Sequence, residues 1–254
     1  MTDTATKPPI TVEICVDSIA SAVAAARGGA DRLELCSSLG EGGITPSAGM
    51  IATVRGLVSI PVHVMIRPRS GDFCYSAEEF SAMKRDIAIA RQLRADGVVL
   101  GILNEDGGID LARCRELIDC ARPMNVTFHR AFDVSRDLTQ SLPDIISLGF
   151  DRLLTSGGEQ KVEDAIPVIV RLRELAVDRI ALMIGSGVNS GNVQKLVVQT
   201  GVREVHASAR HTEPGPMRYR STKVSFASPS QSDYERAVAD EDEVRKLVLA
   251  MSSF

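Results

Sequence analysis

The sequence predicts a single (β/α)8 TIM-type barrel, and three observations support this expectation. Short apolar runs alternate with helical stretches along the chain, which is the pattern of βαβ units in a parallel sheet. Eight apolar runs can be counted, and 254 residues divided among 8 units leave about 32 residues each, enough for a strand, a helix and two short loops. An open doubly wound sheet is the alternative, but no dinucleotide fingerprint follows the first run, so no nucleotide cofactor is expected.

The expected strands are short runs rich in Val, Ile and Leu, each bounded by turn residues. In chain order they are Thr11–Val16, Arg32–Cys36, Val62–Arg67, Val98–Leu103, Val126–His129, Arg152–Ser156, Ile180–Gly185 and Glu204–Ser208. The expected helices are Ser18–Arg27, a second one with Pro46 near its first turn, Ala77–Arg94, Leu111–Ala121, Leu138–Leu148, Lys161–Leu175, Asn189–Val198 and Tyr234–Met251. Asp17 and Ser18 form a capping pair for the first helix.

Two segments fall outside this alternation. Residues 1–9 are predicted to be a disordered tail, because the chain start has no apolar stretch and does not resemble a signal peptide. Residues 10–254 are predicted to form the barrel domain. The irregular, Pro- and Ser-containing stretch His211–Asp233 follows the last barrel strand and is expected to be a lid, an interface arm or a disordered segment.

Composition excludes several function classes. The net charge of −4 argues against nucleic-acid binding and against an anionic-membrane surface. No run approaches the length of a membrane span. The five cysteines show no CxxC pair, so a disulfide framework and a zinc finger are not expected, and a cytoplasmic location with reduced thiols is predicted. The absence of Trp and the 4% of aromatic residues predict an aliphatic core.

Alternation along each strand predicts which side chains enter the barrel, because the apolar set must pack against helices. The first strand then points Glu13 and Cys15 inward, and the second repeats the pattern with Glu34 and Cys36. The full inward set is Glu13, Cys15, Glu34, Cys36, His63, Met65, Arg67, Thr127, His129, His206 and Ser208. Polar residues near the strand ends of a barrel indicate a site. The alternative is that Glu13–Arg67 and Glu34–His pairs form purely structural networks.

Loops after the strands add candidate anion-binding residues at the same mouth. Arginine forks suit a carboxylate or a phosphate, and short glycine turns expose backbone N–H groups to an anion. The candidates are Arg67, Arg69, Asp72, Ser156, Gly187 and Ser208. Ion-paired support of the loops, or ordinary βα turns, would explain the same residues without a ligand.

Two of the cysteines form a candidate metal pair. Neighbouring strands lie about 4.8 Å apart, so the inward Cys15 and Cys36 can approach one another. Thiolates, with Met65 as a further thioether, favour Cu(I) over hard cations. Buried cysteines that only fill space are the alternative, and this is how Cys74, Cys114 and Cys120 are interpreted.

Several long motifs resemble the CutC family, whose members are named copper homeostasis proteins. They are EICVDS at 13–18, GGADRLELC at 28–36, EGGITPS at 41–47, MIRPR at 65–69, GDF at 71–73, VTFHRAFD at 126–133, LTSG at 154–157, EVH at 204–206 and MRYR at 217–220. The resemblance implies a TIM-type barrel, a cytoplasmic location, self-association into dimers or tetramers, and a link to copper tolerance. It also implies Cu(I) binding at Cys15 and Cys36.

Two main functional hypotheses follow. The first is a cytoplasmic copper homeostasis protein that binds Cu(I) through Cys15 and Cys36. The second is an enzyme acting by acid/base chemistry on a small anionic or polyhydroxylated metabolite. Its residues would be Glu13 or Glu34 as base, His129 or His206 as acid, and Arg67 with Arg69 as anion clamp. A scaffold whose long arm mediates assembly is a third interpretation.

Overall fold

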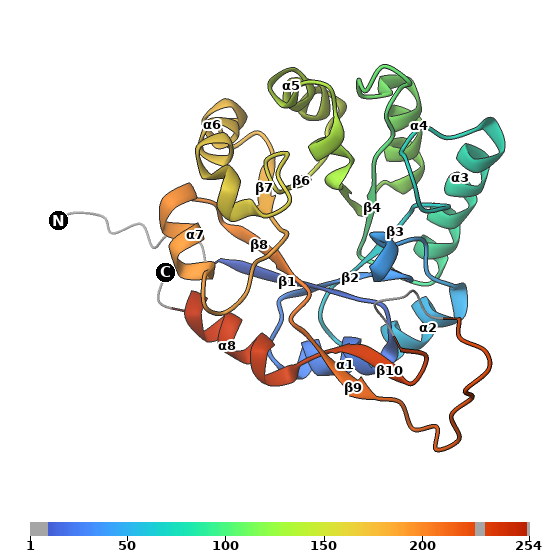
Figure 1. Cartoon of the computed structure of the whole chain (residues 1–254). Helices are drawn as coiled ribbons and strands as arrows, with labels where there is room; N and C mark the ends of the chain where they lie inside the picture. The colour runs from blue at the N-terminus through green and yellow to red at the C-terminus, as the bar shows by residue number, and fades with distance from the viewer. Residues whose placement is uncertain (1–9, 227–231, 253–254) are drawn as a thin grey trace.

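The protein is a closed eight-stranded parallel barrel surrounded by helices, as the sequence predicts (Figure 1). A computed structural model describes residues 10–226 and 232–252. The strands follow one another around the barrel in chain order, and β1 closes the sheet by pairing with both β2 and β8. The predicted disordered tail, residues 1–9, lies outside the described residues.

The barrel strands lie where the apolar runs predict them, with ends that differ by at most a few residues. They are β1 (Thr11–Val16), β2 (Arg32–Leu35), β3 (Val62–Met65), β4 (Gly97–Leu100), β5 (Asn125–Phe128), β6 (Arg152–Thr155), β7 (Ala181–Ile184) and β8 (Glu204–Ala207). Arg67, His129 and Ser208 were expected at strand ends and lie just beyond them. They therefore belong to the mouth of the barrel, where the chain turns away from the sheet.

The outer helices also follow the predicted order. They are α1 (Ile19–Arg27), α2 (Ala48–Leu57), α3 (Ala77–Gln92), α4 (Leu111–Ala121), α5 (Leu138–Leu148), α6 (Ile166–Ala176), α7 (Val193–Thr200) and α8 (Glu241–Met251). Short 3-10 turns η1 (Leu39–Glu41), η2 (Arg130–Val134) and η3 (Val162–Ala165) occupy loops above the strands. The predicted cap is present, because the Ser18 side chain accepts a hydrogen bond from the Ser21 N–H.

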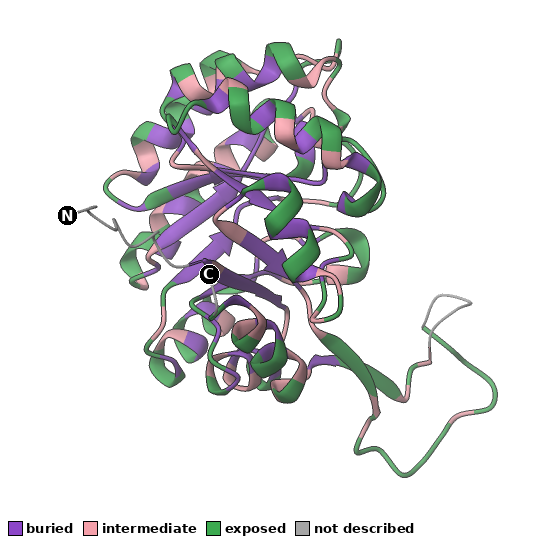
Figure 2. Ribbon diagram, turned by 90° about the vertical axis from the view of Figure 1, so that its left-hand side faces the viewer, coloured by how far each residue is buried: buried purple, intermediate pink, exposed green. Residues whose placement is uncertain are grey.

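The segment after β8 differs from the prediction. Two antiparallel strands, β9 (Arg210–Pro214) and β10 (Glu235–Ala239), form a hairpin, and the described residues between them, 215–226 and 232–234, project from the barrel as an arm (Figure 2). The helix expected to begin at Tyr234 is therefore wrong in its first part, since that stretch pairs with β9 and the helix begins only after the Asp240 N-cap. Residues 227–231 of the predicted irregular stretch lie outside the described residues.

The core divides as strand alternation predicts. Aliphatic side chains on the outer surface of the strands pack with the helices in one large buried cluster, which includes Val12, Ile14 and Val16 of β1. A small separate cluster of Cys36, Met65 and Val99 lies among the inward side chains. None of the helices that the structure describes is long and apolar enough to cross a membrane.

Candidate active and metal site in the barrel mouth

The inner half of the barrel holds a network of ion pairs. Arg32 on β2 donates to Glu13 on β1 and, at 2.6 Å, to Glu204 on β8. Arg152 on β6 also bonds Glu204, and its Nη2 lies 3.0 Å from the Glu204 Oε1. Burial opposes ionisation of Glu13, but the Arg32 charge and the His206 hydrogen bond outweigh it and hold its pKa well below the usual range. This network is structural in character, because its charges compensate one another.

Two members of this network, Arg32 and Arg152, were not among the predicted inward residues. Arg32 lies two residues before Glu34 and so points to the same face of β2. Alternation along this strand could therefore have predicted that Arg32 faces inward. The predicted structural pair between Glu13 and Arg67 is wrong. Arg67 lies beyond the end of β3 at the mouth and bonds backbone carbonyls there, whereas Glu13 is held by Arg32 in mid-barrel.

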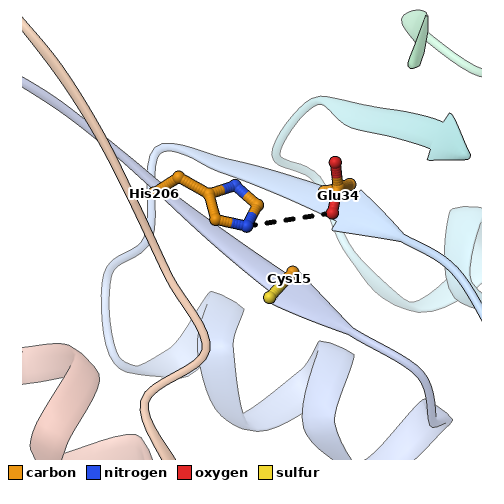
Figure 3. Close-up of side chains that lie close together, drawn as sticks. All are labelled: Cys15, Glu34 and His206. Carbon is orange, nitrogen blue, oxygen red and sulfur yellow. Dashed lines mark ion pairs between the residues drawn. The ribbon is translucent and has the colours of Figure 1, made fainter. Parts of the chain in front are cut away.

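Above this network, Cys15, Glu34 and His206 form a buried cluster (Figure 3). The Cys15 Sγ, a Glu34 oxygen and a ring nitrogen of His206 all lie within 4.8 Å of one another. The His206 Nε2 is 3.8 Å from Glu34 Oε2, and its Nδ1 is 2.7 Å from Glu13 Oε1. Among the described residues this is the group of His, Cys, Asp and Glu side chains arranged closely enough to hold a metal ion.

Burial and charge change the titration of this cluster. Burial raises the pKa of Glu34 to about 7, although the positive charge of His206 opposes the change. Burial would lower the pKa of His206, but the neighbouring Cys15 and Glu34 and the Glu13 hydrogen bond raise it well above the usual value. The contacts with Glu13 and Glu34 therefore favour the protonated form of the His206 imidazole.

A cavity of about 730 Å³ opens above the cluster. The barrel strands contribute Cys15, Glu34, Met65, Leu154, His206 and Ala207 to its lining. The segments after the strands contribute Leu39, Gly42, Arg67, Phe73, His129, Arg130, Ser186, Gly187, Val188, Asn189, Ser208 and Ala209, and the rest are Arg210 of β9 with Asp240 and Glu243 at the start of α8. This volume lies in the range of small-molecule sites. The strand ends thus converge on one site, as barrel topology requires.

Arg67 lies in the wall of this cavity and is buried. Its guanidinium donates to the carbonyl oxygens of Glu41, Gly43 and Gly71 at 2.9, 2.9 and 2.8 Å. The guanidinium also lies over the Phe73 ring, 4.9 Å from its centroid. These contacts position Arg67 without neutralising its charge.

His129 lies beside Phe73, with ring centroids 5.0 Å apart. Its Nδ1 accepts the Ala131 N–H at 3.2 Å, and burial together with the Arg67 charge lowers its pKa to about 3. His129 is therefore neutral and suited to donate a hydrogen bond rather than a proton at neutral pH. Gly101 after β4 makes room for the ring, because a Cβ there would lie 2.8 Å from His129 carbons and nitrogens.

The remaining predicted anion-binding residues divide into two groups. Gly187 and Ser208 line the cavity. Arg69 instead bonds Glu79 at 2.6 Å and Asp72 at 3.0 Å on the outer surface. Ser156 is buried beside Asp133, to which its hydroxyl donates at 2.9 Å. Arg69, Asp72 and Ser156 therefore support loops and are not among the residues lining the cavity.

Cys36 is fully buried next to the cluster but not part of it. Its thiol donates to the Val16 carbonyl at 3.5 Å and packs with Met65 and Val99. Burial raises the pKa of the Cys36 thiol, so a proton must leave before this sulfur can bind a metal. Met65 lines the cavity.

Comparison with known proteins identifies the family. The model of the CutC family matches residues 10–211, which is most of the chain. The chain belongs to the CutC family.

CutC relatives are similar over nearly the whole length. The "Copper homeostasis protein cutC homolog" of Homo sapiens is 48% identical over 237 residues, covering 93% of this chain and 87% of the human protein. The "family protein CutC" of Chromobacterium violaceum is 48% identical over 236 residues, covering 93% of this chain and 96% of the relative. The family resemblance expected from the motifs is thus confirmed, and with it the link to copper homeostasis proteins.

Solved structures agree with the barrel. The crystal structure of a putative copper homeostasis protein CutC from Streptococcus agalactiae superposes with a TM-score of 0.75 at 35% identity, covering 78% of this chain and 98% of that one. Thiamine phosphate pyrophosphorylase from Pyrococcus furiosus superposes with a TM-score of 0.57 at 16% identity, covering 96% of both chains. The second likeness concerns the fold alone.

Proposed function

We propose that this CutC protein is a cytoplasmic copper homeostasis protein that binds Cu(I) in the barrel mouth. The carrying observation is the Cys15–Glu34–His206 cluster, in which a sulfur and an imidazole nitrogen lie within 4.8 Å of one another beside an open cavity. Soft thiolate ligands select Cu(I), and imidazole is a suitable copper ligand. The donor set therefore fits copper.

Cys15 is the central ligand of this proposal, because it combines proximity to His206 with access to the cavity. Cys36 lies directly after the neighbouring strand β2 and would supply the second thiolate once deprotonated. The two cysteines and His206 would hold the ion, and His206 would bind it only after its ring loses the proton that the neighbouring acidic groups favour. Glu34 would take up the proton that a thiol releases on metal binding.

The test is a titration of the reduced protein with Cu(I) against a coloured competing chelator. We expect a tight site in the wild type that is lost in the double variant Cys15→Ser with Cys36→Ser. Cys120→Ser, which changes a cysteine on the outer helix α4, is the matched control and should keep wild-type affinity. Unchanged affinity in the double variant would show that copper does not bind at these thiols.

The raised pKa of Glu34 favours a second candidate function, an enzyme acting by acid/base chemistry in the same mouth. A carboxyl group with a pKa of about 7 that faces a cavity can serve as a general base near neutral pH. Glu13 is less suited to this role, since Arg32 and His206 hold it as a paired carboxylate. Incubation with a pool of small metabolites, followed by mass spectrometry, should show one compound consumed by the wild type and not by Glu34→Gln; no consumption by either protein would contradict this function.

We also propose that the arm between β9 and β10 mediates self-association into dimers or tetramers. It exposes several large apolar side chains, namely Met217, Tyr219, Val224 and Phe226, and Phe226 is 93% exposed. Exposed apolar groups gathered on one segment indicate an interaction surface. Sedimentation analysis should show an oligomer in the wild type and a smaller species in Phe226→Ser with Tyr219→Ser; a monomeric wild type would contradict the proposal.

A further inference from the structure

The cavity wall formed by Arg67, Phe73 and His129 supplies none of the ligands of the copper proposal and carries an unbalanced positive charge. Arg67 is 5% exposed, and within the described residues no acidic side chain forms an ion pair with it. Its three hydrogen bonds go to neutral backbone carbonyls. A buried charge without a counter-charge is costly unless a partner of opposite sign arrives.

His129 adds a hydrogen-bond donor to the same wall. Because its Nδ1 accepts the Ala131 N–H, the neutral ring carries its proton on Nε2. That Nε2 is buried and has no hydrogen-bond partner among residues 10–226 and 232–252. The residue is 4% exposed and lines the cavity, so the wall includes a side chain with an unpartnered N–H.

Phe73 fixes these two donors beside one another. The Arg67 guanidinium lies 4.9 Å from the Phe73 ring centroid, and the His129 ring centroid lies 5.0 Å from it on the β5 side. Both donors are thus oriented by an aromatic ring and by backbone contacts before any ligand binds. Preorganised donors of this kind bind a planar or tetrahedral oxyanion with little reordering cost.

Other residues of the cavity lining offer complementary groups for the rest of a ligand. Glu34 Oε1 is buried and, in the described part of the chain, has no hydrogen-bond partner. Ser186 and Ser208 supply small polar surfaces, and Leu39 and Leu154 supply apolar ones. A single ion would leave most of the 730 Å³ cavity unfilled, whereas a small organic molecule matches it.

We propose that the barrel mouth binds a small organic anion, whose carboxylate or phosphate group is held by Arg67 and His129 and whose hydroxyl or amino group is held by Glu34. The site is distinct from the thiols of the copper proposal, because the two oxyanion donors come from the loops after β3 and β5 rather than from β1 and β2. Anion binding also requires no chemical step, so it can occur whether or not the protein is an acid/base enzyme.

The test is isothermal titration of the full chain with three probes of similar size: glycerate, glycerol 3-phosphate and uncharged glycerol. We expect one of the two anions to bind and glycerol to show no binding at the same concentrations. Which anion binds distinguishes a carboxylate site from a phosphate site. No binding of either anion at low millimolar concentration would overturn the proposal.

Two variants assign the binding to the proposed donors. Arg67→Met and His129→Phe should each weaken anion binding by about tenfold or more, since each removes a hydrogen bond to a charged group. His129→Phe keeps an aromatic ring beside Phe73, so it tests the donor even if Arg67→Met fails to fold. Arg69→Gln is the matched control, because Arg69 is paired with Glu79 outside the cavity lining. Undiminished binding in His129→Phe would overturn the assignment.

A cysteine variant separates this inference from the copper proposal. Cys15→Ser with Cys36→Ser should retain anion binding within about twofold, since neither thiol belongs to the oxyanion wall. Loss of anion binding in that folded double variant, with retention in His129→Phe, would place the anion on the cysteine side and contradict the inference. Failure of copper binding alone would leave these expectations unchanged.

Discussion

The inner network and the mouth of the barrel contain the same kinds of residues but differ in how their charges are balanced. In the inner network, Glu13 and Glu204 bond Arg32 directly, so acids and bases compensate one another. In the mouth, Arg67 bonds only backbone carbonyls, and Glu34 and His129 retain polar atoms without hydrogen-bond partners in the described chain. Compensated charges indicate a structural role, whereas uncompensated ones in an open cavity indicate a ligand.

Removing an arginine charge should therefore lower stability to different extents in the two regions, and the largest loss is expected in the inner network. Arg32→Met leaves Glu13 and Glu204 partly unpaired inside the barrel. Breaking a buried pair on one side costs about 3–5 kcal/mol, so the free energy of unfolding should fall by that order. Chemical denaturation measures it. A loss no greater than that of the mouth variant Arg67→Met would remove the contrast between the regions.

A smaller effect should follow from filling the space that holds His129. A methyl group at Gly101 would lie 2.8 Å from the His129 ring, so Gly101→Ala should cost about 1–3 kcal/mol by overpacking. Gly56 in α2 is the matched control, because a Cβ there meets nothing within 4 Å and a helical Gly→Ala change stabilises by up to about 1 kcal/mol. Denaturation of both variants measures the difference. Equal stabilities would show that His129 is not closely packed.

The most specific effect concerns the pH dependence of stability. Burial lowers the pKa of His63 to about 4, so the folded protein keeps this ring neutral while the unfolded chain protonates it near 6.5. Its contribution to stability is complete above about pH 6.5 and is lost as the pH falls toward 4, because the unfolded state then binds more protons. Between these values the wild type should lose more stability than His63→Gln. If the free energies of unfolding of the wild type and His63→Gln changed with pH in parallel, the lowered pKa of His63 would be contradicted.

Much of the site could be predicted from alternation along single strands. Cys15, Glu34 and His206 were all placed inside the barrel, because the aliphatic residues beside them must face the helices. The partners of these residues could not be predicted. Arg32 replaced Arg67 as the partner of Glu13, since ion pairing depends on the stagger between strands and on the height of each side chain along the barrel axis.

The hairpin that carries the arm also contains a secondary-structure element that the sequence alone did not predict correctly. The stretch before α8 has helix-forming Ala residues and continues into a helix, so it was predicted as helical from Tyr234. In the fold, Glu235–Ala239 pairs with Arg210–Pro214. The local preference of this segment for a helix was overridden by pairing with a strand more than 20 residues away along the chain. Such pairing is a property of the tertiary structure.

By itself, the sequence determined the eight-unit barrel, the family and many of the inward residues, among them Cys15, Glu34 and His206, because these depend on local hydrophobic pattern and on motifs. The tertiary structure alone decided which charges are compensated. Arg69 looked equivalent to Arg67 in the sequence, yet it is paired with Glu79 on the surface, while Arg67 is buried in the cavity wall with only carbonyl partners. The physical reason is that charge compensation depends on distances between groups on different strands and loops, which the order of residues along the chain does not contain.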